Sequence, residues 1–390
     1  MKRKCLAIGL ILLFVGTCLI PAPGQETEIS ALLASSNHWL YVGGNGPENY
    51  TRIQDAVDNA SDGDVIFVFN DSSPYYENVR VDRSIHLIGE DKNSTVIDGN
   101  KVGDIVSISS DFIYLSGFTI QNSGNDDFDA GIEIRSDNNT IVGNVIRDNG
   151  GEDYQDQGGI YLNFSSYNEI SNNMIYDNEQ DGIFLVDSMC NHIHNNTICH
   201  NAFIAMIISR SSANRIEHND MYENYCCLSF WPYSTYNEIL YNHIHDHPGC
   251  GMAFKAYSNH NIIRYNTLSN NKEWGIMLGP GPTKRNVIDS NTISKTTGPG
   301  HWYGGSGLVL QNAYFNTVKH NNIMENRIDV YLNSSLGNIW AGNYWENYSG
   351  FGPKIIVGRL SMPWNPSRAI PWINVDWFPA QKPYDILGMT

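Results

Sequence analysis

Positively charged residues are scarce in this chain, which has 24 Lys and Arg against 41 Asp and Glu. The formal net charge is −17, and it becomes −20 (−17 − 3) if Lys2, Arg3 and Lys4 are removed with the leader described below. Such a surface repels the phosphates of nucleic acids and of anionic membranes. We therefore expect no nucleic-acid partner, whereas cations and neutral sugars are compatible with this charge.

Long hydrophobic runs are absent except at the N-terminus. A basic start, an apolar run over residues 5–20 and a Pro-Ala-Pro-Gly segment follow one another there. This order is typical of a secretory signal peptide, and the run is short for a membrane span, which needs about 20 apolar residues. We predict a signal peptide over 1–24, no membrane span after its removal, and export to the cell surface, the extracellular space or a periplasm-like compartment. An uncleaved anchor is the alternative.

Cysteine is infrequent, and five of the seven cysteines lie beyond the leader: Cys190, Cys199, Cys226, Cys227 and Cys250. Cys227 and Cys250 occupy equivalent places in consecutive units of the repeat described next. A disulfide between these two residues and a set of packed free thiols are both compatible with this spacing and with the odd count.

Asparagine, in contrast, recurs in a strict register about every 23 residues. Each of nine such residues is followed five places later by a second Asn, and usually by a third polar residue five places beyond that. The first set is Asn139, Asn168, Asn191, Asn214, Asn237, Asn261, Asn286, Asn316 and Asn338; the second is Asn144, Asn173, Asn196, Asn219, Asn242, Asn266, Asn291, Asn321 and Asn343.

The residues between these Asn alternate between polar and apolar, which predicts three short strands per unit. One unit cannot bury its own apolar side, so units must stack, with equivalent residues about 4.8 Å apart. Stacked Asn amides then bond to one another, which avoids the ~2–7 kcal/mol cost of an unpaired buried amide. Asn also tolerates the left-handed conformation of a corner. A hexapeptide repeat is absent, so we predict an all-β, single right-handed parallel β-helix of about a dozen turns within residues 38–345.

Both ends of the solenoid are predicted to be capped, because an open end exposes unpaired backbone. Ile53, Ala56 and Val57 have helical spacing, which predicts a capping helix between Tyr50 and Ala60. The tail at 346–390 is rich in Trp and Pro and is predicted to fold over the other end.

Several segments carry a family resemblance over roughly residues 50–350. They are IQDAVDNASDGDVIFV, the segment IHLIGED, the Asn ladder and GNYWENYSG at 342–350. The chain resembles the right-handed parallel β-helix (pectin lyase-like) superfamily, and within it the NosD-like and carbohydrate-binding/sugar-hydrolysis repeat proteins. The resemblance implies the fold strongly and the chemistry weakly, since the group includes lyases, epimerases, hydrolases, copper-handling periplasmic proteins and members that only bind. The Trp-Ile-Asp-His run of many pectate lyases and the Gly-His-Gly of polygalacturonases are missing.

Loop insertions at 123–130, 150–158 and 297–306 enter the repeat at the same edge. Two of them concentrate carboxylates, which are ligands for Ca²⁺. The candidate calcium residues are Asp126, Asp127, Asp129, Glu152, Asp153 and Asp156. Bound Ca²⁺ would bridge an acidic sugar to the protein, while a solvated acidic edge is the alternative.

Beside these loops, one outward row of side chains is predicted to form an apolar and aromatic stripe: Glu133, Tyr161, Phe184, Ile207, Phe230, Ala253, Met277, Val309 and Tyr331. An exposed stripe of this kind suits stacking of sugar rings. The predicted carbohydrate-binding residues are Glu133, Tyr161, Phe184 and Phe230, with Trp302 and Tyr303 overhanging them. The alternative is that loops or the tail cover the stripe.

Arg135, Asp129 and Asp156 are candidate catalytic residues. The resemblance implies that uronate lyases and epimerases of this fold remove a proton with a basic side chain, for which Arg135 is a candidate. The alternative is an ordinary salt bridge from Arg135 to Glu133 or Asp129.

The segment HIHDH places His243, His245 and His247 in alternation, and Asp220 is expected to stack on His243. Imidazole and carboxylate ligands suit copper, which the NosD-like resemblance also implies. His192 and His194 alternate in the same way but on a different strand.

The sequence thus leads us to expect an exported protein that binds a polysaccharide or other extended glycan along one outer face. A Ca²⁺-dependent polysaccharide lyase or epimerase and a NosD-like copper-handling protein are the alternatives, and whether the chain is an enzyme stays open.

Overall fold

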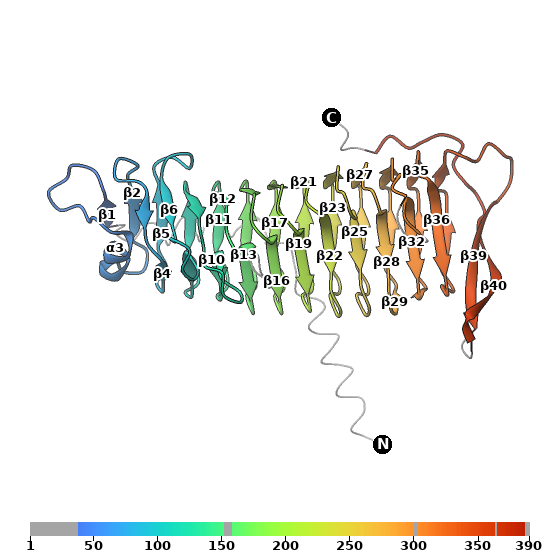
Figure 1. Cartoon of the computed structure of the whole chain (residues 1–390), viewed down its shortest axis with the longest axis horizontal. Helices are drawn as coiled ribbons and strands as arrows, with labels where there is room; N and C mark the ends of the chain where they lie inside the picture. Colours follow the sequence, from blue (N-terminus) through green and yellow to red (C-terminus); the bar gives the residue numbers. More distant parts are fainter. Residues whose placement is uncertain (1–37, 152–157, 300–302, 363–364, 387–390) are drawn as a thin grey trace, which may run out of the picture.

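The computed structural model describes residues 38–151, 158–299, 303–362 and 365–386, so the predicted signal peptide lies outside the described residues. The chain winds into an elongated parallel β-solenoid whose turns lie side by side along one axis (Figure 1). Three rows of short strands form its faces. In the part of the chain that the structure describes, no helix has the length and apolar character needed to cross a membrane.

The first face is the row that the loop insertions enter. Its strands are β4 (Val79–Val81), β7 (Val106–Ile108), β10 (Ala130–Ile134), β13 (Gly158–Asn163), β16 (Asp181–Val186), β19 (Ile204–Ser209), β22 (Cys226–Phe230), β25 (Met252–Phe254), β28 (Trp274–Leu278), β32 (Ser306–Gln311) and β36 (Ile328–Asn333). Adjacent members pair in parallel, and the outward side of this row carries the predicted stripe.

The second face follows each strand of the first after a corner. Its strands are β1 (Trp39–Val42), β2 (Val65–Val68), β5 (His86–Gly89), β8 (Tyr114–Ser116), β11 (Thr140–Val142), β14 (Glu169–Ser171), β17 (His192–His194), β20 (Arg215–Glu217), β23 (Glu238–Leu240), β26 (Ile262–Arg264), β30 (Val287–Asp289), β34 (Thr317–Lys319) and β37 (Ile339–Ala341). A two-stranded ribbon of β29 (Thr283–Lys284) and β33 (Ala313–Tyr314) precedes it at two of the turns.

The third face is a 12-stranded parallel sheet. Its strands are β3 (Tyr75–Tyr76), β6 (Val96–Asp98), β9 (Thr119–Gln121), β12 (Val145–Arg147), β15 (Met174–Tyr176), β18 (Thr197–Cys199), β21 (Asp220–Tyr222), β24 (His243–His245), β27 (Thr267–Ser269), β31 (Thr292–Ser294), β35 (Asn322–Met324) and β38 (Tyr344–Trp345). The middle residue of the three-residue strands points inward, as Ile198, Met221 and Ile244 do, and these three are fully buried. Each such burial stabilises the fold by about 1.5–3 kcal/mol.

The predicted Asn ladders are confirmed. Asn219, for example, donates from both its backbone N and its Nδ2 to Oδ1 of Asn242, each at 3.0 Å. It accepts the same two bonds from Asn196, also at 3.0 Å. These amides are buried, so the ladder satisfies polar groups that water cannot reach and locks each turn onto the next.

The left-handed corner residue is not the ladder Asn, as the sequence led us to expect, but the residue before it. Ala213, Tyr236 and Tyr241 precede ladder residues and have φ of 56°, 59° and 54°. The reason is geometric: the left-handed residue turns the chain, and only then can the next side chain fold back into the interior. Because the corner residue itself faces outward, its type is free to vary.

The N-terminal cap is the predicted helix, α3 (Ile53–Asn59), whose buried face consists of Ile53, Ala56 and Val57. Glu77 accepts hydrogen bonds from the free N–H groups of Ile53 and Gln54 at 2.8 and 3.0 Å. A carboxylate at the positive end of the helix dipole stabilises the helix. The helix therefore covers the first turns as predicted.

The C-terminal tail folds against the other end, where β39 (Lys354–Met362) and β40 (Asn365–Asp376) form an antiparallel hairpin (Figure 1). β39 adjoins β36 and β40 adjoins β37, so the hairpin joins the first and second faces. Asp376 ends the second Asn ladder: Oδ2 accepts from N and Nδ2 of Asn343 and from Nε1 of Trp345.

Candidate functional site

Asp220, His243 and His245 converge on the outer side of the third face. Strands β21 and β24 are neighbours, and Asp220 lies opposite His243 in the register. Oδ1 of Asp220 is 3.1 Å from Nδ1 of His243 and 3.2 Å from Nε2 of His245. One potential ligand atom from each residue lies within 4.8 Å of the others. The sequence-predicted trio is therefore brought together.

A second layer of side chains orients this trio. Oδ2 of Asp246 lies 2.6 Å from Nδ1 of His245, which leaves Nε2 facing Asp220. The ring of Tyr222 stacks on that of His245 at 5.1 Å and 18°. The hydrogen bond from His243 lowers the pKa of Asp220, and the hydrogen bond from His245 lowers the pKa of Asp246. Both carboxylates are thus held charged beside the imidazoles.

The donor set fits a transition-metal ion. Imidazole nitrogens and carboxylate oxygens bind such ions at about 2.0–2.2 Å, so donors around one ion lie about 3–4 Å apart. Two imidazoles with one carboxylate suit Cu²⁺ or Zn²⁺, and Cu²⁺ binds a given site of this type most tightly. His243 is exposed, so a bound ion would keep positions open to solvent. Copper bound there would supply a Lewis-acidic, redox-active centre.

The alternation predicted that His247 lies on the same side as His243 and His245, and this prediction is wrong. Asp246 has φ of 59° and turns the corner, so His247 takes the third ladder position inside the solenoid. Its Nδ1 and Nε2 lie 2.9 and 3.1 Å from the carbonyl oxygens of Asn224 and Met221. Burial lowers the pKa of His247 to about 4, so it is a neutral core residue.

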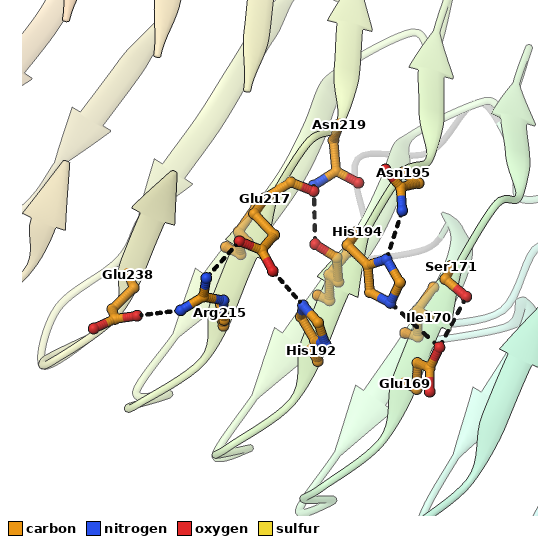
Figure 2. Close-up of polar contacts among 12 residues, drawn as sticks. Glu169, Ile170, Ser171, His192, His194, Asn195, Arg215, Glu217, Asn219 and Glu238 are labelled. Carbon is orange, nitrogen blue, oxygen red and sulfur yellow. Dashed lines mark hydrogen bonds and ion pairs between the residues drawn. The ribbon is translucent and has the colours of Figure 1, made fainter. Parts of the chain in front are cut away.

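His192 and His194 lie on the second face, as predicted, and each forms a hydrogen bond with a glutamate of a neighbouring strand (Figure 2). Nε2 of His192 is 2.8 Å from Glu217, and Nε2 of His194 is 3.2 Å from Glu169 on the opposite neighbouring strand. Arg215 also binds Glu217, at 2.7 Å. Each carboxylate is engaged separately, so this patch resembles the metal trio in composition but not in geometry.

Apart from Phe230, the side chains of the predicted stripe lie in one outward row, but neighbouring side chains cover most of them. Tyr161 and Phe184 stack at 5.5 Å and are only 6% and 4% exposed. Phe128, from the first insertion, stacks on Tyr161, and Trp231 contacts Phe184. The prediction of an exposed platform is therefore wrong for these rings, and the alternative of a covered row describes them.

Phe230 is a second correction, because it points into the main core and is 0% exposed. The turn after Asn224 is one residue shorter than its neighbours, which shifts the strand. Ser229 consequently pairs with Ile207 and Ala253 in the outward row, and Phe230 stacks on Phe254 inside.

At the far end of the row, Tyr303 contacts Trp274 and Tyr331, with ring centroids 5.7 and 5.4 Å apart. Trp302 lies outside the described residues.

The acidic edge is described only in part. Asp126 and Asp127 are exposed, and Oδ2 of Asp129 accepts a hydrogen bond from N of Asp126 at 3.0 Å. Glu152, Asp153 and Asp156 lie outside the described residues, so the calcium set and the catalytic candidate Asp156 remain predictions.

Arg135 forms the salt bridge that was the alternative to a catalytic role. Its Nη2 and Nε lie 2.6 and 2.7 Å from Oε1 of the buried Glu133. Sequence reasoning missed Asp104, which hydrogen-bonds to Glu133 from the preceding turn. Burial and the Glu133 charge raise the pKa of Asp104 to about 7. Asp104 lies before the first ladder Asn, so no repeat signal marked it.

Cys227 does not face Cys250. It points into the core, where its Sγ lies 3.6 Å from Sδ of Met221, and the neighbour of Cys250 is Cys226. Cys199, Cys226, Cys227 and Cys250 are free thiols.

Comparisons with known proteins agree with this fold. The family model described as periplasmic copper-binding protein (NosD) matches residues 57–248, and the model described as right-handed beta helix region matches residues 231–345. No curated protein matches this chain.

Solved structures with the same fold include three proteins of low sequence identity. The A-module of mannuronan C-5 epimerase AlgE6 from Azotobacter vinelandii has a TM-score of 0.53 and 14% identity, covering 74% of this chain and 93% of that one. DFA-IIIase from Arthrobacter chlorophenolicus A6 has a TM-score of 0.59 and 12% identity, and the match covers 79% of this chain and 95% of that one. The Dettilon tailspike protein has a TM-score of 0.53 and 13% identity, and the match covers 84% of this chain and 74% of that one. The solenoid topology and these matches together show that the chain has the right-handed parallel β-helix fold.

Proposed function

We propose that this chain is an exported β-helix protein that binds copper at Asp220, His243 and His245. The observation that carries the proposal is the convergence of two imidazoles and one carboxylate within 4.8 Å on an accessible face. The residues matched by the NosD model include all three. Export rests on the predicted leader at 1–24, and NosD is described as periplasmic, where a copper-binding surface would meet its ion.

The arrangement favours binding over catalysis. Strands β21 and β24 fix the backbone positions of the ligands, and Asp246 fixes the ring of His245. Pre-oriented ligands lower the ordering cost of binding, and second-layer partners of this kind typically change metal affinity about 10–100-fold. Because imidazole binds metals only when neutral, affinity should fall as the solution becomes acidic.

The test is a titration of the purified chain with Cu²⁺, followed by calorimetry and electron paramagnetic resonance. We expect one site with nitrogen hyperfine structure, and a loss of affinity of at least about tenfold in His243→Ala and in His245→Ala. The double variant His192→Ala/His194→Ala is a matched control, since it removes an equally spaced pair from the second face, and should bind as the unchanged chain does. The proposal would be overturned if the control variant lost as much Cu²⁺ affinity as the His243 and His245 variants, or if the unchanged chain showed no saturable Cu²⁺ binding.

Glycan binding is a second candidate, favoured by the cluster at the N-terminal end of the outward row. The side chain of Arg135 is 61% exposed beside Glu133, and the Phe128 ring on Tyr161 is exposed at the same edge. Arginine pairs with carboxylates and the faces of aromatic rings stack on sugar rings, so a sugar acid is a reasonable ligand here. The matched AlgE6 module belongs to a mannuronan C-5 epimerase, and a further protein of the same fold, XylC, has been solved in complex with xylose.

A glycan array, followed by incubation with polyuronates with and without Ca²⁺, tests this candidate. Binding that Arg135→Ala abolishes would support it, and ultraviolet absorbance of an unsaturated product or nuclear magnetic resonance of an epimerised one would assign a lyase or an epimerase. Binding that survives Arg135→Ala, or no binding to any glycan, would contradict it.

A further inference from the structure

Two cysteine side chains from consecutive turns meet on the first face. Cys226 begins β22 and Cys250 lies two residues before β25, and the pairing of Leu228 with Met252 places the two cysteines at equivalent positions. Equivalent residues on adjacent turns have Cα atoms about 4.8 Å apart. This separation lies within the range of about 4.4–6.8 Å that a disulfide requires.

The sulfur of Cys226 is also held in place by its surroundings. The backbone N–H of Cys250 donates to Sγ of Cys226 at 3.2 Å. Gly249 leaves the space for this sulfur, because a Cβ there would lie 2.8 Å from Sγ of Cys226.

The two thiols differ in reactivity. Cys226 is partly exposed, whereas Cys250 is buried. Hydrogen bonds from the thiol and the backbone N–H of Cys250 lower the pKa of Cys226. The same hydrogen bond between the two thiols raises the pKa of Cys250, and burial raises it further. Lys255 favours the Cys226 thiolate and Glu273 opposes it. A partly exposed thiol with a lowered pKa beside a buried thiol with a raised pKa is the arrangement of an attacking and a resolving cysteine.

We propose that Cys226 and Cys250 form an oxidisable dithiol that small disulfides such as glutathione disulfide convert into a disulfide between two turns. The Cys226 thiolate attacks one sulfur of glutathione disulfide, the S–S bond breaks, and glutathione thiolate leaves. Cys250 then loses its proton to water and attacks Sγ of Cys226, which expels the second glutathione thiolate. The protein loses two hydrogen atoms, and one glutathione disulfide becomes two glutathione molecules.

The other cysteines provide internal comparisons. Cys227 is fully buried, with its sulfur against Met221, and should not react in the folded chain. Cys190 is partly exposed like Cys226 but lies at a corner before the second face, in a different turn from the dithiol. A general effect of exposure would therefore modify Cys190 and Cys226 alike, whereas a dithiol would favour Cys226.

The test exposes the reduced full chain to glutathione disulfide with a chelator in every sample, so that copper chemistry plays no part. Free thiols are then alkylated and mapped by mass spectrometry. We expect Cys226 and Cys250 to lose alkylation together, at least about tenfold faster than Cys190, with recovery of their cross-linked peptide. Separate protection of the two residues, or a rate at Cys226 equal to that at Cys190, would overturn the proposal.

Two variants sharpen the result. Cys250→Ser should accumulate a stable mixed disulfide with glutathione on Cys226, because the resolving thiol is gone. Cys227→Ser is the matched control and should form the Cys226–Cys250 disulfide unchanged. If Cys250→Ser carried no mixed disulfide, the attacking role of Cys226 would be refuted. The thiol mapping of the unchanged chain tests the proposal independently, because it does not depend on how any variant folds.

Discussion

Replacing Asn219 by Ala tests how much a single ladder amide stabilises the solenoid. Asn219 is 1% exposed, and its Nδ2 donates to the carbonyl oxygens of Ile193 and Glu217 at 2.9 and 3.0 Å, besides Oδ1 of Asn242. Its Oδ1 accepts from N and Nδ2 of Asn196. Truncation removes the acceptor of the buried N–H of Asn196.

The expected cost follows from these contacts. A buried unsatisfied donor costs about 1–3 kcal/mol, and each net hydrogen bond lost adds about 1 kcal/mol. The cavity left by the amide adds to both, so we expect Asn219→Ala to lower the free energy of unfolding by about 3–5 kcal/mol. Asn219→Asp should be at least as harmful at neutral pH, since it places a buried anion against the carbonyl oxygens of Ile193 and Glu217. The Asp variant should recover partly in acid, where the carboxyl group becomes a donor.

Urea unfolding and amide hydrogen exchange measure this effect. Turns of a solenoid interact mainly with their neighbours, so exchange at the Asn196 amide reports the local change even if unfolding is not two-state. Asn195→Gly is the control: Asn195 is exposed at the adjacent corner, its φ of 54° suits Gly, and its substitution should change stability by less than about 0.5 kcal/mol. A cost below about 1 kcal/mol for Asn219→Ala, with unchanged protection of Asn196, would refute the reasoning.

Three further predictions concern the corners, the C-terminal cap and the acid pair. Ala213→Gly should stabilise the fold by about 0.5–1 kcal/mol, because relief of the left-handed strain exceeds the entropy that Gly adds to the unfolded chain, and a lower urea midpoint would contradict this. Asp376→Ala should remove exchange protection from the last turns and shift Trp345 fluorescence to the red; an unchanged spectrum and exchange pattern would argue against a capping role. Asp104 has a raised pKa of about 7 when folded, so its contribution to stability is full below about pH 4 and is lost as pH rises through about 7. Unfolding free energies at about pH 5 and pH 8 should therefore differ less in Asp104→Asn than in the unchanged chain, and an equal difference would exclude Asp104 as the cause.

The regular parts of this fold were predictable because the signal repeats. Asn196, Asn219 and Asn242 occupy one position in three consecutive units, and only a stacked interior satisfies three such amides together. Asp220 and His243 directly follow Asn219 and Asn242, so the same register predicted their contact. Periodicity therefore predicted the contact between Asp220 and His243 as well as the strands that carry them.

One error arose where the period changes locally: one residue fewer after Asn224 moved Phe230 from the surface to the core. His247 keeps the period, because it stands five residues after Asn242 at the third ladder position, and the corner at Asp246 turns it inward as the corners of the other units do. The repeat register therefore marked His247 as an interior residue, and the local alternation of HIHDH hid that signal. Asp104 was missed for a related reason: it precedes the ladder, and its partner Glu133 lies in another unit.

The ladder and the candidate metal site depend on each other through their positions in the chain. Asn219 and Asn242 lie immediately before Asp220 and His243, and Nδ2 of Asn219 donates to Oδ1 of Asn242 at 3.0 Å. The hydrogen bond between the buried Asn side chains therefore fixes how Asp220 and His243 face each other across consecutive turns. If so, Asn219→Ala should weaken Cu²⁺ binding although Asn219 cannot touch the ion, while a ladder substitution at the distant Asn321 should leave Cu²⁺ affinity unchanged. The site on the surface would then derive its geometry from the hydrogen bonds of the interior.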